Sequence, residues 1–316
     1  MYTQYYGLIG LPFEQTTTPR QLFLPPSHQK ALNHLEYGLS TAKAMTLLTG
    51  EAGTGKTTLL RAALNSERCK SVTCLFVNNP VLSRAEFLEM IARKVGLGAE
   101  VAKSKTTLLA ELEEVLLKRR SRGEIVALVV DEAQSLSQDL FEEIRLLANV
   151  EFESQTLMPM VLAGQPELAS HLNDTSLRQL QQRIALRSTV EPFTLSETGS
   201  YVTARIRAVG GEAARLFSRE AVILIHERSR GIPRLVNVIC DNALMTGVAL
   251  GQRPVGQQVV LDVCRDLDLR RSNESAPSIR STPAAPVTAP PEELEIEEQL
   301  EALGAAVGLT PPTRPH

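Results

Sequence analysis

The stretch from Gly50 to Thr57 constrains this chain more than any other. It reads GEAGTGKT and matches G-x-x-x-x-G-K-[ST], the Walker A pattern of phosphate-binding loops. Glycines let the backbone curl until successive N–H groups face an anion, while Lys56 reaches the β- and γ-phosphates and the Thr57 hydroxyl reaches Mg²⁺. The competing interpretation is a glycine-rich turn that ends in an incidental lysine.

The flanking sequence favours the phosphate-binding loop. A short apolar run of strand length, 44–49, precedes it, and a run of helix formers, 58–64, follows it. Strand, loop and helix form the setting that the motif requires, because a helix N-terminus attracts phosphate. The sequence therefore predicts a nucleotide site at Gly50, Glu51, Ala52, Gly53, Thr54, Gly55, Lys56, Thr57 and Thr58.

A second signature, of the Walker B type, follows at 125–132, where a fully apolar run leads directly into Asp131 and Glu132. In such a pair, Asp131 holds Mg²⁺ through water and Glu132 polarises the water that attacks the γ-phosphate. Two carboxylates after a strand can also be a plain helix start. With a phosphate-binding loop on an earlier strand, the pair predicts a site for ATP and Mg²⁺ with Thr57 and Asp131 as metal ligands.

The next predicted strand, 158–163, ends at Gly164 and Gln165. Ligands bind at the carboxyl edge of parallel α/β sheets, so Gln165 is a candidate to orient the attacking water. Arginines at 178, 183 and 187 are expected on a helix and loop before a last strand at 188–193. Such residues are ordinarily surface residues, but this position also suits an arginine finger that acts on a neighbouring subunit.

The pattern changes along the chain. Alternating strands and helices give way at Leu195 to helices alone, which predicts a second, helical domain. Arg234, in the first turn of one of these helices, suits a lid residue that senses ATP. We expect a lead-in at 1–40, an α/β domain at 41–194, a helical lid at 195–268 and a tail at 269–316.

The two ends of the chain leave alternatives open. In the lead-in, Ser27 is expected to cap a helix at 28–39. The lead-in either contacts the adenine base through Phe13, Phe23 or His28 or packs on the core. In the tail, 270–291 is rich in Ser, Pro and Ala, a composition typical of a linker. The acidic stretch after it, 292–307, is either a partner-docking helix or a marginal helix in a disordered tail.

Net charge, cysteine spacing and the length of apolar runs argue against several classes of protein. A formal net charge of −3 argues against a globally basic nucleic-acid binder. The 4 cysteines form no C-x-x-C pair and are expected as core residues in a reducing compartment. No apolar run has the length of a membrane span, and the start lacks a signal-peptide pattern, so we expect a cytoplasmic protein.

Taken together, these motifs resemble the AAA+ superfamily and, more closely, the ExeA/GspA-type ATPases of general secretion and pilus systems. The resemblance covers roughly residues 1–268. It is carried by Tyr6-Gly-Leu, Leu11-Pro-Phe13, Ser27-His28, the Gly50–Thr57 loop, Val130-Asp-Glu-Ala-Gln134, Leu162-Ala-Gly-Gln-Pro-Glu-Leu168, Gln182-Arg-Ile184 and Gly231-Ile-Pro-Arg234.

The resemblance implies a RecA-like α/β core, a helical lid, ATP with Mg²⁺, and rings or filaments whose active sites lie between subunits. It implies that Arg183 is the finger and Arg234 the lid sensor. The family pattern has Asn, Ser or Thr at the first sensor, where this chain has Gln165. Family members with a periplasmic peptidoglycan-binding part need a membrane span, and since none is evident here, peptidoglycan contact is not carried over.

Three functions remain open from the sequence. The first is an oligomeric ATPase that drives assembly or remodelling of an envelope, secretion or pilus machine. The second is a DNA-associated transposition regulator, because the same ATPase body also resembles transposon target-selection ATPases. The third is an ATP-gated adaptor with slow hydrolysis. Net acidity and the lack of an appended DNA-binding motif favour the first.

Overall fold

The computed structural model describes residues 2–14, 22–78, 81–153 and 155–269. The described residues form two compact units: one lies within Leu24–Glu191, and the other joins the described residues before Leu24 to those from Pro192 to Leu269. The sequence predictions on the linker and the acidic helix, within 270–316, lie outside the described residues.

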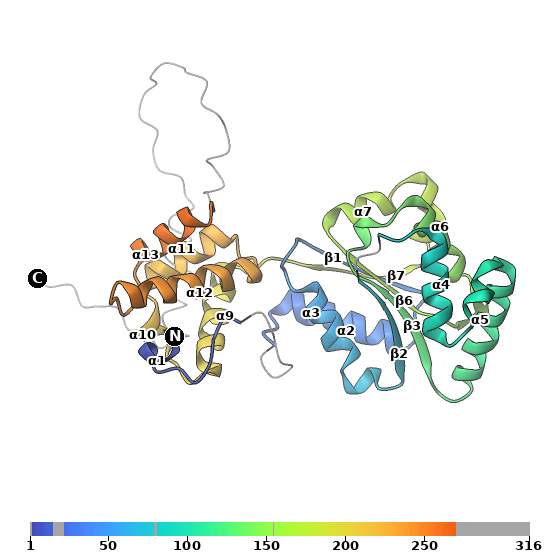
Figure 1. Cartoon of the computed structure of the whole chain (residues 1–316), viewed down its shortest axis with the longest axis horizontal. Coiled ribbons are helices and arrows are strands. Elements are labelled where there is room, and N and C mark those ends of the chain that lie inside the picture. Colours follow the sequence, from blue (N-terminus) through green and yellow to red (C-terminus); the bar gives the residue numbers. More distant parts are fainter. Residues whose placement is uncertain (1, 15–21, 79–80, 154, 270–316) are drawn as a thin grey trace, which may run out of the picture. The chain divides into compact units, whose positions relative to one another are not determined.

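The first unit is built on a parallel five-stranded sheet with the order β2-β3-β6-β1-β7 (Figure 1). Every residue of β1, β3 and β6 is buried, which explains why these strands read as continuous apolar runs. The strands are β1 Met45–Gly50, β2 Val72–Val77, β3 Ile125–Val130, β6 Met160–Gly164 and β7 Ile184–Val190, beside a small antiparallel pair of β4 Glu151–Phe152 and β5 Gln155–Thr156.

Helices cover both faces of this sheet, with α2 and α3 on one face and α4 to α6 on the other (Figure 1). A capping box formed by Ser83 and Glu86 begins α4. The helices of this unit are α2 Pro26–Ser40, α3 Lys56–Leu64, α4 Arg84–Val95, α5 Lys105–Arg120, α6 Gln138–Leu147, α7 Pro166–Leu172 and α8 Arg178–Gln181, with 3₁₀ turns η2 Glu67–Cys69, η3 Ala99–Lys103, η4 Ala133–Ser135 and η5 Thr175–Leu177.

Two predicted element boundaries are wrong. The strand expected at 188–193 runs from Ile184 to Val190, so that Arg187 lies within it. Within the described part of the chain, β7 pairs only with β1, and its side chains alternate in burial, so no apolar run marks where it begins. Ser27 is not a helix cap, because α2 already begins at Pro26, and its hydroxyl bonds to His28 Nδ1 at 3.1 Å.

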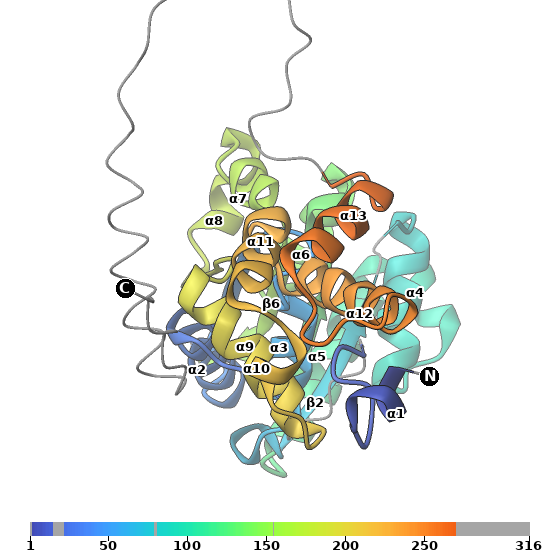
Figure 2. The same cartoon turned by 90° about the vertical axis from the view of Figure 1, so that its left-hand side faces the viewer.

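All regular elements described after Leu195 are helices, as the change of pattern predicts. Figure 2 shows α11, α12 and α13 packed together, around a core that includes Val236 and Ile239. The helices of this unit are α1 Tyr2–Tyr6, α9 Leu195–Ala208, α10 Ala213–Leu216, α11 Arg219–Ser229, α12 Pro233–Ala249 and α13 Gln257–Asp266.

The expected lead-in at 1–40 is divided between the two units. Buried Arg205 of α9 donates from Nε to the carbonyl of Pro12 at 2.6 Å, which holds the start of the chain in the helical unit. Phe13 packs edge-to-face on Phe217, and Phe23 packs in the same way on Phe193. Both rings therefore pack as the ordinary-packing interpretation expects.

Candidate nucleotide site

The loop after β1 adopts a conformation that its glycines make possible. Gly53 and Gly55 have φ of 85° and 103°, in the left-handed region that side chains with a Cβ avoid. At Gly50, an added Cβ would lie 2.6 Å from the carbonyl oxygen of Val190 in the neighbouring strand. The loop then passes directly into α3 at Lys56, so the first backbone N–H groups of that helix lie at the loop.

Lys56 lies inside this loop, with 5% of its surface exposed. Its ammonium donates to the carbonyls of Gly50 at 2.8 Å and Glu51 at 3.0 Å. Burial lowers the pKa of Lys56, while the nearby carboxylates, led by Glu132 and Asp131, act in the opposite direction. A buried cation held by two carbonyls of the loop suits the recognition of a polyanion.

His28 supports the loop from α2. Its Nε2 lies 3.0 Å from the carbonyl oxygen of Thr54, which is itself fully buried. A carbonyl only accepts, so Nε2 carries the proton and the Nδ1 of a neutral ring accepts from Ser27. The sequence suggested His28 for the adenine; the structure shows it holding loop backbone.

The predicted metal ligands, Thr57 in the first turn of α3 and Asp131 directly after β3, are in contact. The Thr57 hydroxyl donates to Asp131 Oδ2 at 2.6 Å, and Asp131 is almost fully buried, with 1% exposed. The other oxygen of Asp131 accepts from the backbone N–H of Glu132 at 3.0 Å. A hydroxyl and a carboxylate are hard oxygen donors, and Mg²⁺ in nucleotide sites takes few protein ligands beside phosphates and water. This pair therefore fits Mg²⁺.

Glu132 follows Asp131 in the left-handed region, with φ of 55°. Its carboxylate accepts from Gln134 Nε2 at 2.6 Å, and Gln134 Oε1 accepts from the backbone N–H of Gln165 at 3.0 Å. Gln134 had no predicted role, although it is a polar residue only two positions after Glu132. The contact from Gln165 uses its backbone, so the water-orienting role of its side chain stays a prediction.

The predicted arginines have different surroundings. Arg183 donates to the carbonyl of Ala148 at 2.9 Å and pairs with Glu151, with 28% of its side chain exposed. Arg178, at the start of α8, lines a surface depression with Arg145 and other polar side chains, and Arg187 is exposed in β7. Their role as fingers stays a prediction, with Arg183 first.

Arg234 belongs to the helical unit, where it is exposed in the first turn of α12. The turn before it is fixed by Gly231, which has φ of 69° and accepts from the backbone N–H of Phe193 at 2.8 Å. An added Cβ at Gly231 would lie 2.0 Å from the carbonyl oxygen of Phe193. This close approach explains the glycine of the Gly-Ile-Pro-Arg sequence.

The comparisons with known sequences agree with this geometry. The AAA domain family matches residues 40–172. Over 255 residues, or 81% of the chain, the sequence is 36% identical to General secretion pathway protein A of Aeromonas hydrophila. The chain is an AAA+ protein of the ExeA/GspA type. It spans 46% of the length of that relative.

Solved AAA+ structures share the fold at low sequence identity. Cdc6p of Pyrobaculum aerophilum matches with a TM-score of 0.60 at 19% identity, over 81% of this chain and 70% of that one. The ORC2 protein of Aeropyrum pernix gives 0.59 at 16%, over 81% and 71%. RuvB of Thermotoga maritima, a Holliday junction branch migration motor, gives 0.52 at 16%, over 90% and 81%.

Two further observations on this AAA+ protein concern membrane-spanning helices and cysteines. Within the described ranges, no helix has the length and apolar character needed to span a bilayer. All four cysteines are free, and burial raises the pKa of each thiol, that of Cys74 to about 12. They are therefore weak nucleophiles at neutral pH.

Proposed function

We propose that this AAA+ protein binds and hydrolyses ATP in the presence of Mg²⁺. The observation that carries the proposal is the hydrogen bond between Thr57 and Asp131, because it joins the phosphate-binding loop to the acidic end of β3. Lys56 and Glu132 lie at the same ends of β1 and β3. One edge of the sheet thus holds a phosphate-binding cation, a pair of metal ligands and a base.

Each group of residues at the site has its own proposed role in ATP binding and hydrolysis. Backbone N–H groups of residues 50–58 and the Lys56 ammonium bind the phosphates. Thr57 and Asp131 would hold Mg²⁺, and the ion would supply positive charge to the phosphate oxygens of the bound nucleotide. The oxygen of a water attacks the γ-phosphorus as the bond to the ADP oxygen breaks, and Glu132 accepts the proton that the water loses. Gln165 is proposed to orient this water.

The biological role that we propose is assembly or remodelling of an envelope, secretion or pilus machine, from the cytoplasmic side. It is supported by the 36% identity to General secretion pathway protein A, of which this chain spans 46%. That relative favours this role over a DNA-associated regulator. A slow ATP-gated adaptor differs from it only in turnover, so a measured hydrolysis rate separates the two.

We also propose that the active protein is a homo-oligomer, a ring or a filament, in which Arg183 reaches the γ-phosphate of a neighbouring subunit and Arg234 senses ATP from the lid. In the single chain, the Arg183 guanidinium is held by Ala148 and Glu151. In the oligomer, Arg183 would have to give up its contacts with Ala148 and Glu151 in order to bind the γ-phosphate.

Nucleotide binding is tested with Lys56→Ala. Removing a charged hydrogen-bond donor costs about 1.5–3 kcal/mol, so we expect a fluorescent ATP analogue to bind about ten- to hundredfold more weakly. Lys70→Ala is the matched control, because Lys70 is an exposed lysine that pairs with Glu67. Equal affinities of wild type, Lys56→Ala and Lys70→Ala would refute the assignment of the phosphate site.

A further inference from the structure

We propose that Gln134 is a positioning residue for ATP hydrolysis, which holds the carboxylate of Glu132 and links it to the end of β6. This inference rests on the proposed function, because it concerns the same site. Gln134 lies in η4, the turn that joins β3 to α6. Its side-chain amide is hydrogen-bonded at both ends, to Glu132 at 2.6 Å and to Gln165 at 3.0 Å.

The orientation of this amide follows from its neighbours. The backbone N–H of Gln165 can only donate, so it requires the oxygen of the amide. The nitrogen of the amide then faces Glu132, whose ionised carboxylate can only accept. Both contacts are satisfied by one orientation of the side chain, and the flipped orientation would place donor against donor and acceptor against acceptor.

The space for the amide is provided by Gly164, the last residue of β6. A Cβ added there would lie 2.6 Å from Gln134 Oε1 and 3.2 Å from the Gln134 backbone nitrogen. Gly164 lies beside Thr49 in the register of β6 with β1, next to the strand end that leads into the phosphate-binding loop. The amide therefore connects the carboxylate to a fixed point of the sheet.

The side chain of Glu132 needs a contact from another residue to hold it in one conformation. It has a left-handed backbone, with φ of 55°, which is uncommon outside glycine. A free glutamate side chain also rotates about several bonds, and a base acts efficiently only when it is held within hydrogen-bond reach of the attacking water. The Gln134 contact restricts this motion without touching Lys56 or Thr57. Its loss should thus affect the chemical step and spare nucleotide binding.

The first test is Gln134→Leu, which keeps the approximate size of the side chain and removes both hydrogen bonds. Loss of a group that orients a reacting residue typically costs 10–100-fold, so we expect kcat for ATP to fall about 10–100-fold. The Kd of the fluorescent ATP analogue should stay within about twofold of wild type. The matched control is Gln138→Leu, since Gln138 is exposed at the start of α6 and donates to Ser176.

A second variant, Gln134→Asn, keeps an amide on a shorter arm that cannot span both contacts. We expect an intermediate kcat and an unfolding midpoint close to that of wild type. Retained wild-type kcat in both folded variants would overturn the inference, and so would a loss of nucleotide affinity as large as the loss of kcat.

The decisive test is a double-mutant cycle with Glu132→Gln, followed under single-turnover conditions. If Gln134 acts through Glu132, then Gln134→Leu lowers the rate in the wild-type background and has no further effect in the Glu132→Gln background. Equal losses in both backgrounds would show a general structural role and contradict the inference. Failure of the proposed function is recognised separately, because a wild-type protein without ATP turnover would already show it.

Discussion

At the scale of single residues, Gly164 shows how one missing side chain shapes the site. Its added Cβ would lie 2.6 Å from Gln134 Oε1 and 2.9 Å from Leu168 Cδ2. We expect Gly164→Ala to lower the free energy of unfolding by about 1–3 kcal/mol, the usual cost of overpacking, measured by urea denaturation. Gly98→Ala is the control, because nothing lies within 4 Å of a Cβ there. Equal stability of both variants would contradict this account.

The sequence predicted some site residues and missed others for a physical reason. Lys56, Thr57, Asp131 and Glu132 were predicted from short motifs, and in the structure Thr57 and Asp131 are in contact. Gln134 was missed, and it is in contact with Gln165, which lies 31 positions further along the chain. Contacts of this kind depend on how strands pair, and a local pattern carries no information about them.

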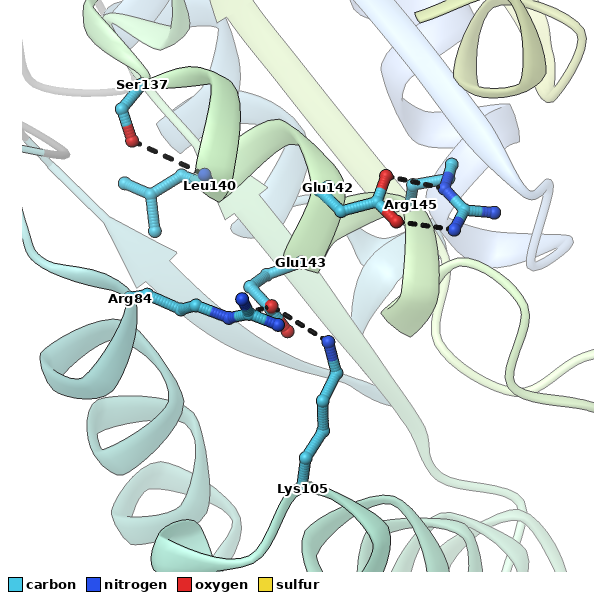
Figure 3. Close-up of polar contacts among 7 residues, drawn as sticks. All are labelled: Arg84, Lys105, Ser137, Leu140, Glu142, Glu143 and Arg145. Carbon is cyan, nitrogen blue, oxygen red and sulfur yellow. Dashed lines mark hydrogen bonds and ion pairs between the residues drawn. The ribbon is translucent and has the colours of Figure 1, made fainter. Parts of the chain in front are cut away.

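At the scale of elements, a buried ion cluster holds three helices together. Glu143 of α6 is 1% exposed, and it pairs with Arg84 at the start of α4 and with Lys105 at the start of α5, the latter at 2.9 Å (Figure 3). A buried carboxylate is tolerated only when it is paired. The cluster therefore fixes where these three helices meet.

The cluster predicts a non-additive effect on stability. Arg84→Ala and Lys105→Ala should each lower the free energy of unfolding by about 1 kcal/mol or less, because one cation still faces Glu143. The double variant should lose about 3 kcal/mol or more, because the buried charge is then unpaired. Urea denaturation measures all three changes.

The control for the cluster is a pair of exposed cations from the same region, Arg93 and Lys103, which pair with Glu89 and Glu100. We expect Arg93→Ala and Lys103→Ala to be nearly neutral and additive. If the losses in free energy of unfolding caused by Arg84→Ala and Lys105→Ala were also additive, pairing of the buried Glu143 carboxylate with these two cations would not explain the stability of the cluster.

Elements were predicted best where a local signal fixes them. The run of helix formers at 58–64, for example, lies within α3. The start of β7 was missed because half of an edge strand faces away from the core. The cluster around Glu143 was also missed, since its residues come from helices that are separate in sequence.

At the scale of the whole molecule, the two units have separate cores. The sheet unit is centred on residues such as Leu128 and Ile144, and the helical unit on residues such as Val236 and Ile239. The change to helices alone was visible in the sequence. The packing of the described residues before Leu24 in the helical unit was not, because it depends on contacts such as that of Arg205 with Pro12, 193 positions apart.

Assembly is tested by mixing inactive subunits. Arg183→Ala and Lys56→Ala should each abolish turnover, and a mixture should regain some, because some interfaces pair an intact finger with an intact loop. Glu151→Ala, which breaks the same ion pair and keeps the arginine, should stay active. No rescue in mixtures that co-assemble would count against Arg183, and Arg187 and Arg178 would be tested next.

The measurement that tests the central claim most directly is ATP binding and phosphate release by Glu132→Gln. This change keeps the shape of the side chain and removes the charge that accepts a proton from water. We expect ATP to bind with wild-type affinity while turnover falls by roughly two to four orders of magnitude. Glu113→Gln, at an exposed position of α5, should match wild type in both respects. Unchanged phosphate release by Glu132→Gln would show that Glu132 is not the base and would contradict the account.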